Sequence, residues 1–166
     1  MTSGIGSAVT NKVVARITGP AGLNAGLAAL TDGDSTFTAM VDAAQVRALN
    51  VAAEMAERSG GVKYPAVNVY CEKIANQLKE KFRSFSGSVG MAIELRHSQD
   101  RLEGLQEQLE LYADSAMQML NSSRGDWGDG MFYTGEYEVS FGAVKQGGKN
   151  FIQTAKVTFE IGVSRN

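Results

Sequence analysis

Strict alternation of hydrophobic and polar positions marks the second half of the chain. Successive side chains of a β-strand point to opposite faces, so an alternating stretch with one apolar set predicts a strand with one buried face. Residues 145–150, KQGGKN, separate the last two stretches, and their glycines suit a tight reversal into an antiparallel hairpin. The three apolar sets are Val89, Met91, Ile93 and Leu95; Tyr137, Val139 and Phe141; and Ala155, Val157, Phe159, Ile161 and Val163.

Between the first and second of these strands the apolar period changes to that of a helix. Ser98 can cap this helix, and Asp100 and Glu103 would lie near the positive end of its dipole. The stripe predicts one amphipathic helix of about six turns that packs on the sheet. Its members are Leu102, Leu105, Leu109, Tyr112, Ala116 and Leu120.

An earlier strand is expected over residues 66–71, AVNVYC, because Tyr64 and Pro65 favour an extended chain and strand-forming residues follow. The next segment, 72–86, is strongly charged. A short exposed helix and the arms of a long hairpin both suit it.

The apolar residues of segment 72–86 are Ile74, Leu78 and Phe82, at helical i, i+4 and i+8 spacing among charged neighbours. The density of charge around them excludes deep burial on all sides.

The N-terminal part carries weaker helical patterns. Two short helices are expected on either side of Gly19-Pro20, the first capped by Ser7 or Thr10 and the second reaching Leu30. Residues 32–35, DGDS, then predict a turn.

Residues 42–58 favour a helix over an extended segment, because Asp42 is a good N-cap and Gly60-Gly61 a good stop. We expect one α+β domain over residues 1–166, with an N-terminal helical segment, 1–61, and a sheet-and-helix core, 62–166. The core is expected to be a mostly antiparallel β-sheet of about four strands with the long amphipathic helix packed on it.

Charge and composition narrow the function classes. Sixteen Lys and Arg residues against eighteen Asp and Glu give a formal net charge of −2, which does not suit tight binding to duplex nucleic acid. The single cysteine, Cys71, excludes an internal disulfide and a cysteine-based zinc cage. With neither a signal-peptide pattern nor a run that suggests a membrane span, we expect a soluble protein with no membrane partner.

No catalytic, cofactor-binding or metal-binding residues are expected, so the chain is not predicted to be an enzyme. The only histidine, His97, has no neighbouring nucleophile or second ligand in the local sequence, and Cys71 lies in an apolar strand. Residues 125–130, GDWGDG, offer two carboxylates to a cation but lack the ligand spacing of an EF-hand loop. The usual phosphate-binding, dinucleotide, hydrolase and zinc-protease motifs are absent.

Three segments at the ends of strands or helices are instead candidates for contact with partners. They are the charged segment 72–86, the GDWGDG loop and the KQGGKN turn. Trp127 either docks on the core of its own subunit or is offered to a partner. The candidate interface residues are Lys73, Lys79, Lys81, Arg83, Asp126, Trp127, Asp129, Lys145 and Lys149.

The order of elements resembles the tail terminator proteins of long-tailed bacteriophages, also called tail completion or tail-to-head joining proteins. The resemblance spans roughly residues 8–165 as an arrangement of elements. It is closest at PAVNVY, the strand SVGMAIEL, the helix SQDRLEGLQEQLELYADSAMQML and the strands YEVSF and TAKVTFEIGVS. Residues 36–61 form a longer segment than the family pattern has.

The resemblance implies a virion structural protein, assembled in the host cytoplasm and located at the neck of the tail. Its subunits would form a ring, expected to be a hexamer, that caps the tail tube protein and meets the head connector or stopper protein. Viral DNA would pass through the ring only transiently, and a mildly acidic chain is compatible with that.

Two other function classes stay open. One is a different connector or neck ring, or a tail tube subunit, although a long helix in the middle of the sheet favours the terminator. The other is a small ligand-binding or enzymatic α/β domain that uses His97 or the pair Asp126 and Asp129.

Overall fold

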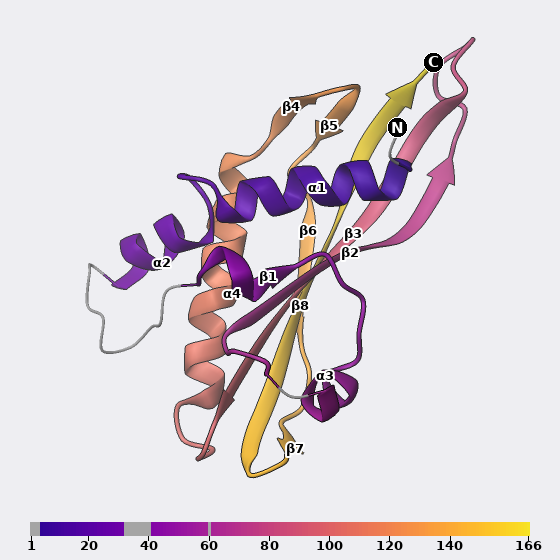
Figure 1. The fold of residues 1–166 in the computed structure, drawn as a ribbon. Helices are drawn as coiled ribbons and strands as arrows, with labels where there is room; N and C mark the ends of the chain where they lie inside the picture. The colour runs from indigo at the N-terminus through magenta and orange to yellow at the C-terminus, as the bar shows by residue number, and fades with distance from the viewer. Residues whose placement is uncertain (1–3, 32–40, 60) are drawn as a thin grey trace.

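The computed structural model describes residues 4–31, 41–59 and 61–166 (Figure 1). Within these residues one twisted sheet of eight strands runs in the order β1-β2-β3-β8-β5-β4, and β6 and β7 also pair with β8. The strands are β1 Val46–Arg47, β2 Ala66–Asn76, β3 Phe85–Gln99, β4 Gly125–Gly128, β5 Met131–Tyr133, β6 Tyr137–Phe141, β7 Lys145–Gly147 and β8 Asn150–Arg165.

The α+β class and the N-terminal helices agree with the sequence, but the prediction of about four, mostly antiparallel strands is wrong. The sheet is mixed, because β1 pairs with β2 in parallel. The strands that the sequence missed have only two to four residues each, as β1, β4 and β5 show. Such short strands contain too few residues for an alternating pattern to emerge.

Strands β3 and β8 form the spine of the sheet. They pair antiparallel along their whole length, from Phe85 opposite Arg165 to Gln99 opposite Phe151. The other edge of β8 is shared by β7, β6 and β5 in turn. The C-terminal strand is therefore central to the sheet, and the predicted β7–β8 hairpin through KQGGKN is confirmed.

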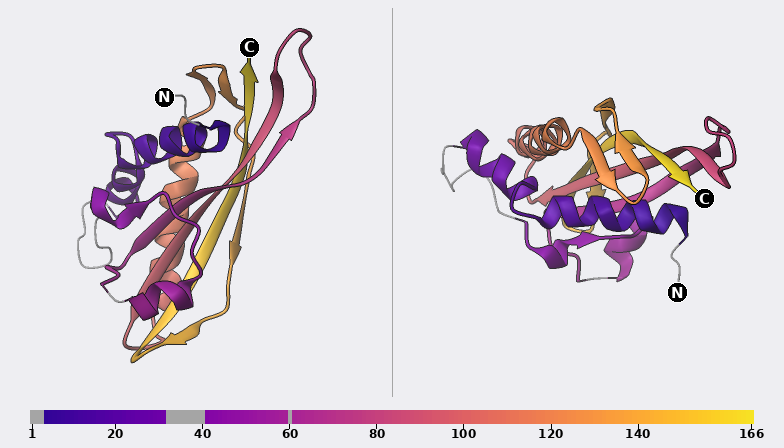
Figure 2. Two further views of the ribbon diagram at one scale, coloured as in Figure 1. Left: turned by 45° about the vertical axis from the view of Figure 1, so that its right-hand side comes forward. Right: turned by 90° about the horizontal axis from the view of Figure 1, so that it is seen from above.

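Four α-helices complete the described fold: α1 Ile5–Thr18, α2 Leu23–Thr31, α3 Ala53–Ser59 and α4 Leu105–Ser122. Helices α1 and α4 cover one face of the sheet, on the same side in Figure 2. The apolar sides of the strands and helices join in one core. Leu109, Val89 and Ile161 have no exposed surface, as expected for side chains between a helix and a sheet.

Helix α4 begins later than the sequence predicted. Strand β3 continues to Gln99 because each of its residues is paired with β8, and this pairing overrides the capping signal at Ser98. The helix starts after Gly104, whose φ of 76° is a left-handed conformation that glycine adopts at little cost. Leu102, expected on the apolar stripe, is 58% exposed.

The two N-terminal helices are confirmed on either side of the break at residues 19–22. The N-cap of α1 is Gly4, not Ser7 or Thr10. The turn expected at residues 32–35 lies outside the described residues.

The helix expected over 42–58 is wrong in most of its length. A 3₁₀ turn, Ala43–Gln45, is followed by strand β1, and a helix appears only at α3. The buried Gln45 side chain explains the change, because its Nε2 donates to the Pro65 carbonyl over 2.7 Å and anchors this segment beside β2. A distant backbone partner has outweighed local helical spacing.

By length and composition, the segment Ile5–Thr31 is apolar enough to cross a membrane, although the sequence did not suggest a span. Its helical path breaks between α1 and α2. Val9, Val13, Leu23 and Leu27 from this segment are buried in the core. Packing within the subunit accounts for these apolar residues.

Candidate interaction surfaces

The segment 72–86 forms the end of the β2–β3 hairpin, so the hairpin alternative is the one found. We call these residues the arm. Pairing of β2 with β3 shifts register between Cys71 and Lys73, and it then continues to Asn76 opposite Gly87. Beyond this irregularity the hairpin projects from the body of the molecule, beside the end of β8 (Figures 1 and 2).

The tip of the arm, residues 77–84, presents large apolar side chains to solvent. Phe82 is 100% exposed and Leu78 is 71% exposed, and Ile74 below the tip is 51% exposed. Leu78 has a φ of 51° and Phe82 a φ of 64°, a backbone region that bulky residues rarely occupy. Such conformations persist where surrounding contacts impose them, and they concentrate at functional positions.

Hydrogen bonds give the tip a defined shape. The Asn76 Oδ1 atom accepts from the backbone N–H groups of Leu78, at 3.3 Å, and Ser86, at 3.1 Å. The Ser86 carbonyl accepts from Gln77 and its hydroxyl oxygen from Glu80, both over 3.0 Å. These bonds hold the backbone on both sides of the turn that carries Phe82.

Further bonds tie the tip to the end of β8. The Ser164 hydroxyl donates to Glu80 Oε2 over 2.9 Å, and the Ser84 hydroxyl donates to the Arg165 carbonyl over 3.3 Å. Arg83 forms an ion pair with Glu80 at 3.2 Å. Lys79, Lys81 and Arg83 thus gather at the tip, as the sequence suggested.

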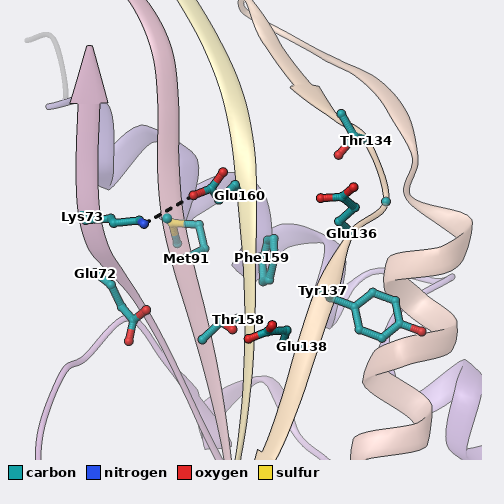
Figure 3. A pocket seen from close by; sticks show the side chains of 12 residues that line it. Glu72, Lys73, Met91, Thr134, Glu136, Tyr137, Glu138, Thr158, Phe159 and Glu160 are labelled. Carbon is teal, nitrogen blue, oxygen red and sulfur yellow. Dashed lines mark ion pairs between the residues drawn. The ribbon is translucent and has the colours of Figure 1, made fainter. Parts of the chain in front are cut away.

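Lys73, the fourth predicted cation, lies at the base of the arm beside an acidic groove. Its Nζ atom is 3.5 Å from Glu160 Oε1. The groove has a volume of about 700 Å³ and runs between β8 and the chain that links β5 to β6 (Figure 3). Its acidic lining residues are Glu72, Glu136, Glu138 and Glu160.

The groove exists because the chain leaves the edge of β8 between β5 and β6. Phe132 pairs with Gly162 and Tyr137 with Phe159, so residues 133–136 lie opposite only residues 160–161. Gly135, with a φ of 105°, allows the excursion. Figure 3 shows Glu136, Glu138 and Glu160 around the opening, whereas the Tyr137 ring points away from it and packs against the core.

The two sides of the groove differ in charge pairing. Glu72 forms an ion pair with Lys156, and Glu160 one with Lys73. Glu136 and Glu138 are exposed and form no ion pair among the described residues. These two carboxylates therefore dominate the charge of the side nearest β6.

The GDWGDG loop is a small hairpin of β4 and β5, and Trp127 docks on its own subunit. Its indole Nε1 donates to the Ser123 carbonyl over 2.7 Å, and its ring lies 5.8 Å from that of Tyr133. The Arg16 guanidinium lies 4.4 Å from the indole centroid, a cation–π contact. Trp127 therefore packs on the core of its own subunit and is not offered to a partner.

The two aspartates of this loop also make contacts within the subunit. Asp126 Oδ1 accepts from the Gly128 N–H at 2.8 Å, and Asp129 forms an ion pair with Lys12 at 3.1 Å. Lys12 also donates to the Trp127 carbonyl. Throughout the described residues, no group of three or more His, Cys, Asp or Glu side chains is placed to hold a metal ion.

Lys145 and Lys149 lie at the other end of the molecule from the arm. The β7–β8 turn precedes the first residue of β8, whereas the arm lies beside the last residues of that strand (Figure 1). The predicted interface residues are therefore split between opposite ends of the sheet.

His97 and Cys71 have environments that suit packing. Burial lowers the pKa of His97, whose ring lies 5.7 Å from that of Tyr112. Burial raises the pKa of the Cys71 thiol and so disfavours the reactive thiolate.

Reasoning from the sequence missed two parts of these surfaces. The apolar residues of the tip were visible in the sequence but were read as part of an undecided helix or hairpin. Glu136, Glu138 and Glu160 come from two distant segments and have no common motif. No protein-family model matches this chain, and no curated protein matches it either, so its function is inferred from these surfaces.

Proposed function

We propose that the chain is a virion structural protein that acts through contacts alone, as a tail terminator that forms a ring. In this role it caps the tail tube and joins it to the head connector around the DNA channel. The observation that carries the proposal is the arm, which holds a fully exposed Phe82 in a defined loop outside the body of the subunit. Exposed aromatic and aliphatic side chains in a structured projection are typical of a surface that a partner covers.

The distribution of surfaces along the molecule supports a joining role. The arm and the acidic groove lie toward one end of β8, and the lysine-bearing β7–β8 turn lies at the other. A ring built from heterologous contacts exposes different ends of each subunit on its two faces. Two chemically distinct ends suit a ring that meets a tail tube on one side and a connector on the other.

The net charge also supports a channel through which DNA passes. A formal charge of −2 gives no strong electrostatic attraction for phosphate. The open face of the sheet carries cations that are already paired, such as Lys156 with Glu72. Paired cations release few counterions on contact with DNA and so bind it weakly.

A tail tube subunit is the second candidate, favoured by the size of the sheet. An eight-stranded sheet with one polar face is better suited to form part of the wall of a tube than the four-stranded sheet expected from the sequence. The two roles differ in assembly, because tube subunits stack into long filaments whereas a terminator stops at one ring.

The decisive experiment is electron microscopy of virus particles made without this protein. We expect tails of irregular length and heads that lack attached tails, with both defects reversed when the wild-type protein is supplied in trans. Complete absence of tails would favour the tube subunit instead. Normal tails of uniform length attached to heads would overturn both assembly roles.

A further inference from the structure

We propose that the tip of the arm of one copy docks in the acidic groove of a second copy. The inference rests on the proposed ring-forming function and identifies the contact that builds the ring. One patch meets a different patch, so the contact is heterologous and can repeat around a closed ring.

Charge complementarity is the first argument for this occupant. The tip carries Lys79, Lys81 and Arg83 against one acidic residue, Glu80. The groove carries four glutamates, of which Glu72 and Glu160 pair with lysines, so among the described residues its unpaired negative charge comes from Glu136 and Glu138. Opposite charges on two patches of the same chain steer copies toward one relative orientation and disfavour contacts of like patches.

Apolar surface is the second argument. Phe82 and Leu78 are the two most exposed large apolar side chains among the described residues. The groove volume of about 700 Å³ falls within the roughly 300–1,000 Å³ of sites that enclose drug-sized ligands. Met91 and Phe159 add apolar residues to its lining, so it can accept one aromatic ring and a lysine stem.

The groove cannot be filled by the tip of its own subunit's arm, although Glu72 and Lys73 at the base of that arm line it. Ser84 and Glu80 bind Arg165 and Ser164 at the end of β8, whereas the groove contains Glu160. Arg165 lies five residues beyond Glu160 in the same strand. At about 3.3 Å per residue this places the tip roughly 16 Å away, so the occupant must come from another molecule.

The experiment is a charge exchange, read by sedimentation equilibrium and native mass spectrometry of the full chain. The arm variant is Lys79→Glu with Lys81→Glu, and the groove variant is Glu136→Lys with Glu138→Lys. Each pair is expected to weaken self-association by roughly tenfold or more, because like charges then face each other across the contact. All four changes in one chain restore opposite charges and are expected to recover most of the lost association.

Two controls separate the contact from folding and from general charge effects. The exchanged side chains are exposed, so circular dichroism and the melting temperature should match those of the wild type. Arg58→Glu with Arg101→Glu makes the same charge change as the arm variant at exposed positions outside both the arm and the groove, and it should leave self-association unchanged.

Several outcomes would overturn the inference. They are wild-type assembly by both the arm and the groove variants, failure of the four-residue exchange to recover association, or a wild-type chain that stays monomeric up to about 1 mM. None of these results decides the proposed function, which the microscopy of particles lacking the protein tests separately. Particles that lack the protein but have normal, head-attached tails would contradict the proposed function even if the arm and groove variants fail to associate.

Discussion

Replacing Trp127 by alanine is expected to lower the free energy of unfolding by about 3–5 kcal/mol. The indole is 6% exposed and packs between Tyr133 and the Arg16 guanidinium. A buried aromatic side chain removes roughly 150–250 Å² from water, and about 25 cal/mol per Å² gives about 4–6 kcal/mol before relaxation and the remaining methyl group are deducted. Loss of the hydrogen bond to the buried Ser123 carbonyl adds about 1 kcal/mol.

Urea unfolding followed by far-ultraviolet circular dichroism measures this change. Trp127 is the only tryptophan, so wild-type fluorescence reports this one site and should shift to longer wavelength as the β4–β5 hairpin detaches. The matched control is Trp127→Phe, which keeps contact with Tyr133 but lacks the indole N–H. It is expected to cost about 1–2 kcal/mol.

We expect the alanine variant to lose more stability than the phenylalanine variant. A loss below about 1 kcal/mol for the alanine variant would show that Trp127 is not part of the core. That result, together with reduced assembly, would return Trp127 to the surface that contacts a partner. For a chain of this size each kcal/mol corresponds to about 2–4 °C in melting temperature, so the expected difference is readily measured.

Three further predictions concern the sheet. Burial lowers the pKa of His97, so its neutral form stabilises the fold fully above pH 6.5. The free energy of unfolding should then decrease as the pH drops from 6.5 toward the folded-state pKa, by at most about 1.4 kcal/mol per pH unit, and urea unfolding of His97→Gln should show a smaller dependence on pH. Gly87→Ala would place a methyl group 1.9 Å from the Ala75 carbonyl oxygen and should cost about 1–3 kcal/mol, with faster amide exchange in the arm. The matched control, Gly142→Ala, meets only the Thr154 carbonyl oxygen at an ordinary contact distance of 3.5 Å and should change neither. Arg96→Met should lower the free energy of unfolding by about 3–5 kcal/mol in thermal unfolding, because Arg96 is 4% exposed and its partner Glu94 would be left without its cation. If Arg96→Met costs as much in a Glu94→Gln background, the two side chains do not stabilise each other and the prediction is wrong.

The long periodic elements could be predicted because their pattern repeats several times. Strand β3 was expected from four alternating apolar residues, and helix α4 from a stripe that its buried Leu105, Leu109 and Tyr112 confirm. The break between α1 and α2 followed from the local chemistry of Gly19 and Pro20. In each case the structure depends on residues close together in the chain.

The incorrect predictions concern segments whose structure depends on pairing with residues far away in the sequence. Strand β1 has two residues and exists through parallel pairing of Val46 with Val67. The late start of α4 follows from pairing between β3 and β8, and Ser98 is opposite Ile152 instead of capping a helix. The extra strands along β8 likewise depend on which segments reach its free edge. Local sequence contains no record of these pairings, so the strand count came out too low.

The arm shows how an incorrect period can still be informative about function. Ile74, Leu78 and Phe82 have the spacing of a helix face, which in a subunit that folds alone would be covered by its own core. The hairpin instead leaves all three more than half exposed. These side chains therefore contribute little to the stability of the isolated subunit, while hydrogen bonds around Asn76 and Ser86 hold the loop that carries Phe82. A loop that is ordered by polar contacts and exposes its apolar residues fits the proposed contact with a second copy of the chain, which would cover those side chains.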